Sequence, residues 1–284
     1  MSVKTYINRA IRYIIKGQPV QIVTPNIMQI PENNWLLNKV VLITGGTSGI
    51  GKAIAVACAR AGADVYITGR NQQRLETAIG KINSFNFPKK TKGVILDNAD
   101  VKNIQIVLKD FLSHHSVDIL INNAGVNGAL LQSCSEKEYD DVMNTNLKGS
   151  IFISRIIGQD MIAKNIKGNI LNICSSSSVR PANSAYVLSK WGMRSFTLGL
   201  AKSLIKHGIV VNGLAPGPTA TPMLVNEENS NIALPDNPSG RYVLPEEVAN
   251  MAVVLVSGFC RMVVGDIVYI TGGAGLLTID DIKY

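Results

Sequence analysis

The sequence predicts an α/β protein built on one doubly wound parallel sheet with helices on both faces. Short apolar runs alternate with amphipathic helical patterns from Lys39 onward. Segments rich in glycine, amide and hydroxyl residues follow several of these runs, where a parallel sheet binds its ligands. The chain has 284 residues, of which 46% are hydrophobic, so it can bury a full core.

Seven apolar runs have the length of buried strands. They are residues 39–44, 63–68, 92–96, 117–121, 168–173, 208–215 and 266–271. Helical patterns separate most of them, which indicates right-handed crossovers in a parallel sheet.

The helices are recognised by apolar residues that recur every three or four positions, as Ile50, Ile54 and Ala57 do. The predicted helices are residues 49–62, 72–82, 101–112, 135–157 and 245–257, and one that begins near Ser184. The long helix 135–157 opens with a capping box made by Ser135 and Glu138.

We interpret residues 39–284 as one domain and residues 1–38 as an N-terminal extension, because no linker-like segment follows residue 38. The extension contains "YINRAIRYIIKG", a basic amphipathic helical pattern. Such a helix can lie on a membrane surface or contact a partner, here through residues 1–20. The alternative, an arm that packs on its own domain or on a neighbouring subunit, is favoured.

Charge and cysteine content exclude several classes of protein. Lys and Arg outnumber Asp and Glu by 28 to 20, but only Lys89, Lys90 and Lys92 are tightly grouped, which argues against nucleic-acid binding. No apolar run is long enough to span a membrane. The cysteines are scattered and indicate reduced thiols in a cytoplasmic protein, without a disulfide framework or a metal site; they are Cys58, Cys134, Cys174 and Cys260.

The first strand is followed by "TGGTSGIG", which opens a helix. Glycines permit a tight turn, and the free N–H groups of the helix start can bind a pyrophosphate. A structural turn is the alternative. The residues expected at the cofactor here are Gly45, Thr47, Ser48, Gly49, Ile50 and Gly51.

The second strand is followed by "TGRN", with no acidic residue before Glu76. An NAD enzyme is expected to place a carboxylate there for the ribose hydroxyls. Arg70 can instead pair with a 2′-phosphate through a charge-assisted contact, so we expect NADP(H) to be preferred over NAD(H). The alternative is a solvated arginine at a helix start.

Asx-rich and glycine-containing segments follow the third and fourth strands. Asp97 can bond an adenine amino group, and the "NNAG" segment can wall the adenosine side, although such residues also make turns. The cofactor-binding candidates here are Asp97, Asn98, Asn123, Ala124 and Gly125.

Tyr186 and Lys190 follow the fifth strand and lie four residues apart, so they share one helix face about 5–6 Å apart. The lysine ammonium favours the ionised phenol, which makes the tyrosine a usable general acid and base. A nearby serine of the run 175–178 can hold the oxygen of a carbonyl substrate. A chance Tyr-x-x-x-Lys is the alternative.

Together these motifs resemble the short-chain dehydrogenase/reductase family of the single-domain type, over residues 39–273. The resemblance rests on "TGGTSGIG", "NNAG", "NTN", the serine run, "YVLSK" and "PGPTATPM". It implies a Rossmann fold and hydride transfer between a nicotinamide and a small carbonyl or alcohol substrate. It also implies that Pro216, Gly217, Thr219 and Thr221 contact the nicotinamide end of the cofactor.

The resemblance further implies a catalytic tetrad. Tyr186 exchanges the proton of the substrate oxygen, and Lys190 stabilises the ionised tyrosine and bonds the nicotinamide ribose. Ser175 holds the substrate oxygen, and Asn146 holds a water that links Lys190 to solvent. The interval from Ser175 to Tyr186 is shorter than the family usually has, so Ser176 and Ser177 are rival candidates.

Two other functions stay open. One is a 3-oxoacyl-carrier-protein reductase, which shares the motif set; the other is a non-catalytic nucleotide-binding regulatory protein. The family resemblance also implies a homotetramer or homodimer assembled through helices 136–160 and 184–204, and a substrate lid at residues 223–243 that identifies no substrate.

Overall fold

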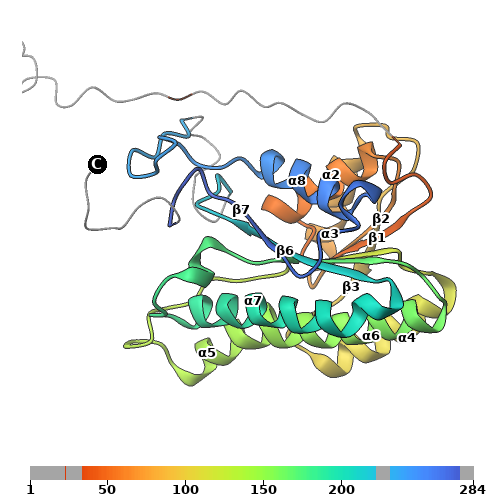
Figure 1. Cartoon of the computed structure of the whole chain (residues 1–284), viewed down its shortest axis with the longest axis horizontal. Coiled ribbons are helices and arrows are strands. Elements are labelled where there is room, and N and C mark those ends of the chain that lie inside the picture. Colours follow the sequence, from red (N-terminus) through yellow and green to blue (C-terminus); the bar gives the residue numbers. More distant parts are fainter. Residues whose placement is uncertain (1–22, 24–33, 222–230, 276–284) are drawn as a thin grey trace, which may run out of the picture.

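The computed structural model describes Val23, residues 34–221 and residues 231–275 (Figure 1). Its middle layer is one seven-stranded parallel sheet with the strand order β3-β2-β1-β4-β5-β6-β7. The order reverses between β1 and β4, which is the switch point of a doubly wound sheet. The predicted fold class is therefore confirmed.

Each predicted strand forms close to its expected place. The strands are β1 (Val40–Ile43), β2 (Asp64–Gly69), β3 (Lys92–Ile95), β4 (Ile119–Asn122), β5 (Asn169–Ile173), β6 (Val210–Pro216) and β7 (Ile267–Ile270). Successive strand side chains point to opposite faces, so one strand supplies two cores. In β1, Val41 and Ile43 enter one core and Leu42 enters the other, and all three are fully buried.

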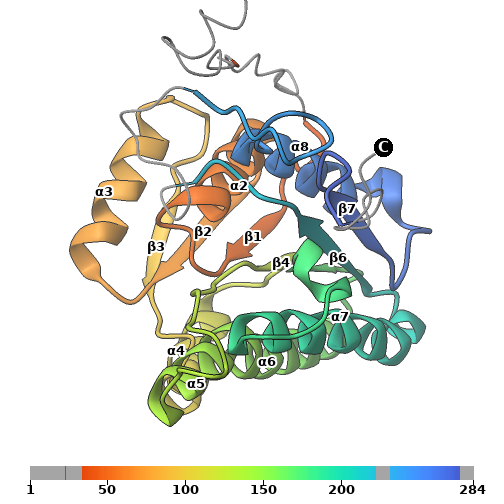
Figure 2. The ribbon, with the colours of Figure 1, turned by 90° about the vertical axis from the view of Figure 1, so that its left-hand side faces the viewer.

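The helices form two layers, one on each face of the sheet (Figures 1 and 2). The layer that shares its core with Val41 consists of α2 (Gly49–Arg60), α3 (Gln72–Asn83) and α8 (Pro245–Val256). The opposite layer consists of α4 (Val101–His114), α5 (Glu136–Met143), α6 (Gly149–Ala163) and α7 (Ala185–Leu204).

The long helix expected at 135–157 is interrupted. It begins with the predicted capping box, in which Ser135 and Glu138 bond each other's backbone N–H groups. A π-helical turn, Asn144–Lys148, then separates α5 from α6. The chain nevertheless stays helical from Glu136 to Ala163, so the predicted helix is confirmed and only the π-helical turn within it was missed, because spacing patterns do not resolve one extra residue in a turn.

The domain's packing begins before residue 39. The side chain of Leu36 is buried in the same core as α2, and its N–H donates to the carbonyl of Ala61. The amphipathic pattern predicted within residues 1–20 lies outside the described residues.

No helix among the described residues is both long and apolar enough to cross a membrane. The same part of the chain holds no group of three or more His, Cys, Asp or Glu side chains placed to bind a metal ion.

Candidate functional site

A cavity of about 380 Å³ lies across the carboxyl ends of the strands. The strand-to-helix loops meet there because parallel strands end at one edge of the sheet. Every residue predicted to bind the cofactor lines this cavity: Gly45, Thr47, Ser48, Gly49, Ile50, Gly51, Arg70, Asp97, Asn98, Asn123, Ala124, Gly125, Tyr186, Lys190, Pro216, Gly217, Thr219 and Thr221.

The glycine loop between β1 and α2 depends on its glycines for shape. Gly45 and Gly49 have φ values of 64° and 51°, in the left-handed region that side chains disfavour. A Cβ on Gly45 would also lie 2.7 Å from the Cα of Ala124, so a side chain does not fit. The loop therefore lets the cavity reach the backbone N–H groups at the start of α2.

The neighbouring strand braces this loop. The side-chain amide of Asn123 donates to the carbonyls of Thr44 and Gly45, at 3.0 Å each. The hydroxyl of Thr44 accepts from the N–H groups of Asn123 and Ala124. The donors of the Asn123 amide are thus used to fix the glycine loop, which the sequence pattern alone did not indicate.

One end of the cavity carries two exposed arginines, Arg70 after β2 and Arg74 in the first turn of α3. The other wall of this end contains Asp97 and Asn98. The Asp97 carboxylate accepts from the N–H of Ala99, while the buried Nδ2 of Asn98 has no hydrogen-bond partner among the described residues. A buried amide donor without a partner is costly unless a ligand accepts from it.

The other end of the cavity carries the tyrosine and lysine of α7. Ser184 caps the helix by accepting from the N–H of Val187, which sets the start of α7 beside β5. Lys190 is buried, its Nζ donates to the carbonyl of Ile173 at 2.8 Å, and it lies 5.7 Å from the centre of the Tyr186 ring. Both side chains line the cavity, as the four-residue spacing predicts.

Only one of the three candidate serines lines the cavity. Ser175 follows the end of β5 and borders the space beside Tyr186, whereas Ser176 and Ser177 do not line it. The Ser175 hydroxyl accepts from the N–H of Ser177, so it keeps its own proton to donate. The geometry therefore favours Ser175 over its neighbours.

Asn146 does not line the cavity. Its side chain lies in the π-helical turn and is fully bonded: its oxygen accepts from the N–H of Val126, and its amide donates to the carbonyl of Val126 and the hydroxyl of Ser189. The side chain thus joins the loop after β4 to α7. A water held by this residue would have to bond its backbone instead.

The segment after β6 lines the cavity where the nicotinamide end of the cofactor is expected. The N–H of Gly217 donates to the carbonyl of Ile270, and a Cβ there would lie 2.8 Å from the Cα of Thr271. The Thr219 hydroxyl donates to the carbonyl of Gly217 and is buried. Residues 223–230 of the expected substrate lid lie outside the described residues.

Sequence reasoning missed several lining residues. Most contribute backbone or apolar surface and carry no chemical signal: Thr68, Gly69, Leu96, Val126, Thr145, Ile173 and Cys174. Burial raises the pKa of the Cys174 thiol to about 11, so it stays protonated at neutral pH and is no nucleophile.

The residues present fit a dinucleotide phosphate cofactor. The glycine loop admits a pyrophosphate at the start of α2, where a side chain would collide with the backbone. The unpartnered Nδ2 of Asn98 offers a donor at the end where the adenosine is expected, beside two arginines that suit a phosphate.

Comparison with known proteins agrees with this geometry. Residues 39–231 match the family model described as short chain dehydrogenase. The chain is 34% identical over 241 residues to gluconate 5-dehydrogenase of Gluconobacter oxydans, covering 82% of this chain and 93% of that protein. It is also 34% identical over 244 residues to a 3-oxoacyl-[acyl-carrier-protein] reductase of Thermotoga maritima, covering 84% of this chain and 98% of that protein.

Solved structures are similar over the same part of the chain. A protein from Beutenbergia cavernae, described as an NAD(P)-dependent gluconate 5-dehydrogenase with bound NADP, has a TM-score of 0.77 at 30% identity and covers 87% of this chain and 100% of its own. L-sorbose reductase of Gluconobacter frateurii, complexed with NADPH and L-sorbose, has a TM-score of 0.78 at 27% identity and covers 88% and 100%. With its family model, its relatives and its sheet, this chain is an oxidoreductase and belongs to the short-chain dehydrogenase/reductase family.

Proposed function

We propose that this oxidoreductase prefers NADP(H) and transfers a hydride between the nicotinamide and a carbonyl or alcohol substrate, with Tyr186 as general acid and base. The observation that carries the proposal is the placement of Tyr186, Lys190 and Ser175 at one end of a cavity whose other end holds Arg70 and Arg74. A substrate carbonyl at that end lies between a hydroxyl donor and a phenol.

Each residue has a distinct task in this proposal. Tyr186 gives its phenolic proton to the substrate oxygen in reduction and takes it back in oxidation. Lys190 donates to the carbonyl of Ile173, and this bond holds its amino group 5.7 Å from the centre of the Tyr186 ring. Ser175 donates to the developing oxygen charge. When bound, the nicotinamide supplies or accepts the hydride.

Preference for NADP(H) rests on charge at the adenosine end. Arg70 and Arg74 line the cavity, and neither makes an ion pair with a described carboxylate. A 2′-phosphate would supply the missing counter-charge, whereas a free 2′-hydroxyl would not.

Two substrate classes are supported by relatives. The names gluconate 5-dehydrogenase and L-sorbose reductase indicate sugars or sugar acids as substrates. The name 3-oxoacyl-[acyl-carrier-protein] reductase indicates 3-oxoacyl thioesters. A panel containing 5-dehydrogluconate, L-sorbose and a 3-oxoacyl thioester, assayed by loss of NADPH absorbance, separates the two.

The test of the proposed mechanism is Tyr186→Phe, which removes the phenolic hydroxyl alone. We expect turnover on the best substrate of the panel to be abolished while NADPH still binds, as followed by cofactor fluorescence. A variant that retained substantial turnover would remove Tyr186 from the mechanism. A wild-type protein that binds NADPH and reduces no carbonyl would instead favour a regulatory protein.

A further inference from the structure

A second and larger cavity lies on the outer side of the α2, α3 and α8 layer. This groove has a volume of about 1230 Å³; we call it the outer groove. Its long walls are α2 and α3, the start of α8 at Leu244 and Pro245 closes one side, and Phe85 stands just beyond the end of α3. It shares five lining residues with the cofactor cavity, and its other lining residues are its own; the shared residues are Thr47, Ser48, Gly49, Arg74 and Thr221.

The outer groove is strongly basic. Four cationic side chains line it, namely Lys52, Arg60, Arg74 and Lys81, against one acidic residue, Glu246. None of the four cations forms an ion pair with a carboxylate among the described residues. The groove therefore presents positive charge without a partner and attracts an anion.

The floor and the end of the groove are apolar. Val56 and Ala57 of α2 line the floor between the cations, and Ile82 lines the wall formed by α3. Phe85 is 56% exposed and stacks on the buried Phe87, with ring centres 5.7 Å apart. An exposed aromatic ring held rigidly from below is costly in water and is stabilised by entering an apolar phase.

Two further lysines extend this surface. Lys89 and Lys90 follow Phe87 in the loop from α3 to β3, and neither makes an ion pair with a described residue. Arg60 lies over the ring of Phe87, 5.8 Å from its centre, which ties the cations of α2 to this aromatic loop. Cations and an exposed ring thus occupy one continuous surface.

From this combination we propose that the outer groove, with the loop of Phe85, docks on the surface of an anionic phospholipid membrane. Lysine and arginine side chains near such a surface are attracted by its phosphates and carboxylates. An aromatic ring among them can enter the boundary between headgroups and acyl chains. A free phosphate would contact the cations and leave the Phe85 ring in water. An acidic protein is the occupant that a failure to bind the mixed vesicles would favour.

This inference is independent of the reaction proposed above. The residues that the test changes lie outside the cofactor cavity and have no part in the proposed chemistry; they are Arg60, Lys81 and Phe85. It is also separate from the amphipathic pattern in residues 1–20, which lies outside the described residues.

The test measures sedimentation of the full-length protein with vesicles of phosphatidylcholine alone and of phosphatidylcholine mixed with phosphatidylserine. We expect binding to the mixed vesicles only, weakened by added salt. Arg60→Gln together with Lys81→Gln should lower the affinity by about five-fold per cation, on the order of 25-fold for the pair. Phe85→Ser should lower it further without any change in charge.

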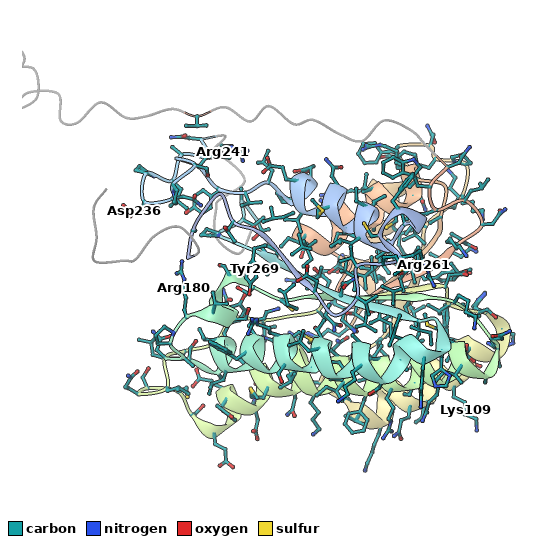
Figure 3. All side chains as sticks on the ribbon, in the orientation of Figure 1. Lys109, Arg180, Asp236, Arg241, Arg261 and Tyr269 are labelled. Carbon is teal, nitrogen blue, oxygen red and sulfur yellow. The ribbon has the colours of Figure 1, made fainter. Side chains whose placement is uncertain are left out.

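The matched control is Lys102→Gln with Lys109→Gln, which removes the same charge from exposed positions of α4 in the opposite layer (Figure 3, where Lys109 is labelled). This pair should bind vesicles as the wild type does, and all variants should keep the wild-type affinity for NADPH. The proposal is overturned if the control loses as much affinity as the groove pair, if Phe85→Ser binds normally, or if the full-length protein ignores the mixed vesicles.

Discussion

Four consecutive serines follow Cys174, and three of them, Ser175, Ser176 and Ser177, are the candidates for holding the substrate oxygen. Ser175 lines the cofactor cavity, whereas Ser176 and Ser177 do not. We expect Ser175→Ala to lower kcat/KM by on the order of 10²–10³, the usual effect of removing one donor to a developing oxyanion. Ser176→Ala and Ser177→Ala are the matched controls and should retain most activity. If Ser176→Ala proved to be the damaging change, the substrate oxygen would have to be placed elsewhere.

Arg70 decides the choice of cofactor if the proposal is right. A charge-assisted contact to a phosphate contributes about 1.5–3 kcal/mol, so NADPH should bind wild-type protein roughly ten- to a hundredfold more tightly than NADH. Arg70→Ala should erase most of that difference, because NADH loses little. Fluorescence titration of both cofactors measures it, with Lys109→Ala as a control on a distant helix. Equal affinities of the wild-type protein for the two cofactors would refute the preference.

Single residues were predicted best where chemistry and spacing coincide. Tyr186 and Lys190 are four apart on a helix, and the structure places both in the cavity. The contact of Lys190 with the carbonyl of Ile173 could not be predicted, because a backbone carbonyl has no sequence signal. The hydrogen bonds of the Asn123 side chain to the glycine loop were missed for a related reason, because its partners are backbone oxygens of the loop after β1, far away in the sequence.

At the scale of elements, the start of α8 is fixed by one carboxylate. Glu247 accepts two hydrogen bonds from the guanidinium of Arg241, at 2.6 and 2.9 Å, and one from the N–H of Leu244 at 2.8 Å. The arginine thereby holds the segment before the helix onto its first turn. This clamp is partly exposed, so solvent weakens its contribution to stability.

Glu247→Gln should lower the free energy of unfolding by about 1 kcal/mol at neutral pH, because the charge-assisted bonds are lost. The hydrogen bonds from Arg241 lower the pKa of Glu247 in the fold below its ordinary value of 4.5. The stabilisation is therefore present above pH 4.5 and disappears as the pH falls through the lowered pKa. Urea unfolding of both proteins across this range should show the two curves converging in acid. Parallel curves would mean that the carboxylate charge contributes nothing.

The type and position of the strands and helices were predicted well, but the π-helical turn within one predicted helix was not. Strand and helix periodicity placed every strand, but the π-helical turn at Asn144–Lys148 is invisible to it. The turn is explained by tertiary bonds: the Asn146 side chain is bonded to Val126 and Ser189, on two other segments. Side chains that bridge segments override local pattern, and a single sequence does not reveal which segments meet.

At the scale of the whole molecule, α7 presents an apolar stripe to solvent. Trp191 and Leu198 of α7, and Ile205 directly after its end, recur at seven-residue intervals and are 39%, 45% and 40% exposed. Phe196 and Leu200 of the same helix are partly buried and pack against the cores. Stripes of this kind are unusual on a surface that stays in water.

We therefore expect a homodimer or homotetramer that buries this stripe, as the family resemblance implies. Leu198→Asp should shift the assembly towards monomers, since a buried unpaired charge is strongly unfavourable. Light scattering at micromolar concentration gives the mass, and circular dichroism verifies that the fold is kept. Lys206→Glu, next to the end of the stripe, serves as a control for added negative charge. A wild-type monomer would contradict the expectation.

The hydrogen bonds that hold the glycine loop in place also bear on when the loop can form during synthesis of the chain. The bond from Asn123 to the Thr44 hydroxyl joins residues 79 positions apart, and β1 has no partner on that side until β4 exists. Closing so long a loop costs entropy that local contacts do not repay. We therefore expect the glycine loop to take its final shape only after β4 has been synthesised, although the glycine motif stands near the beginning of the chain.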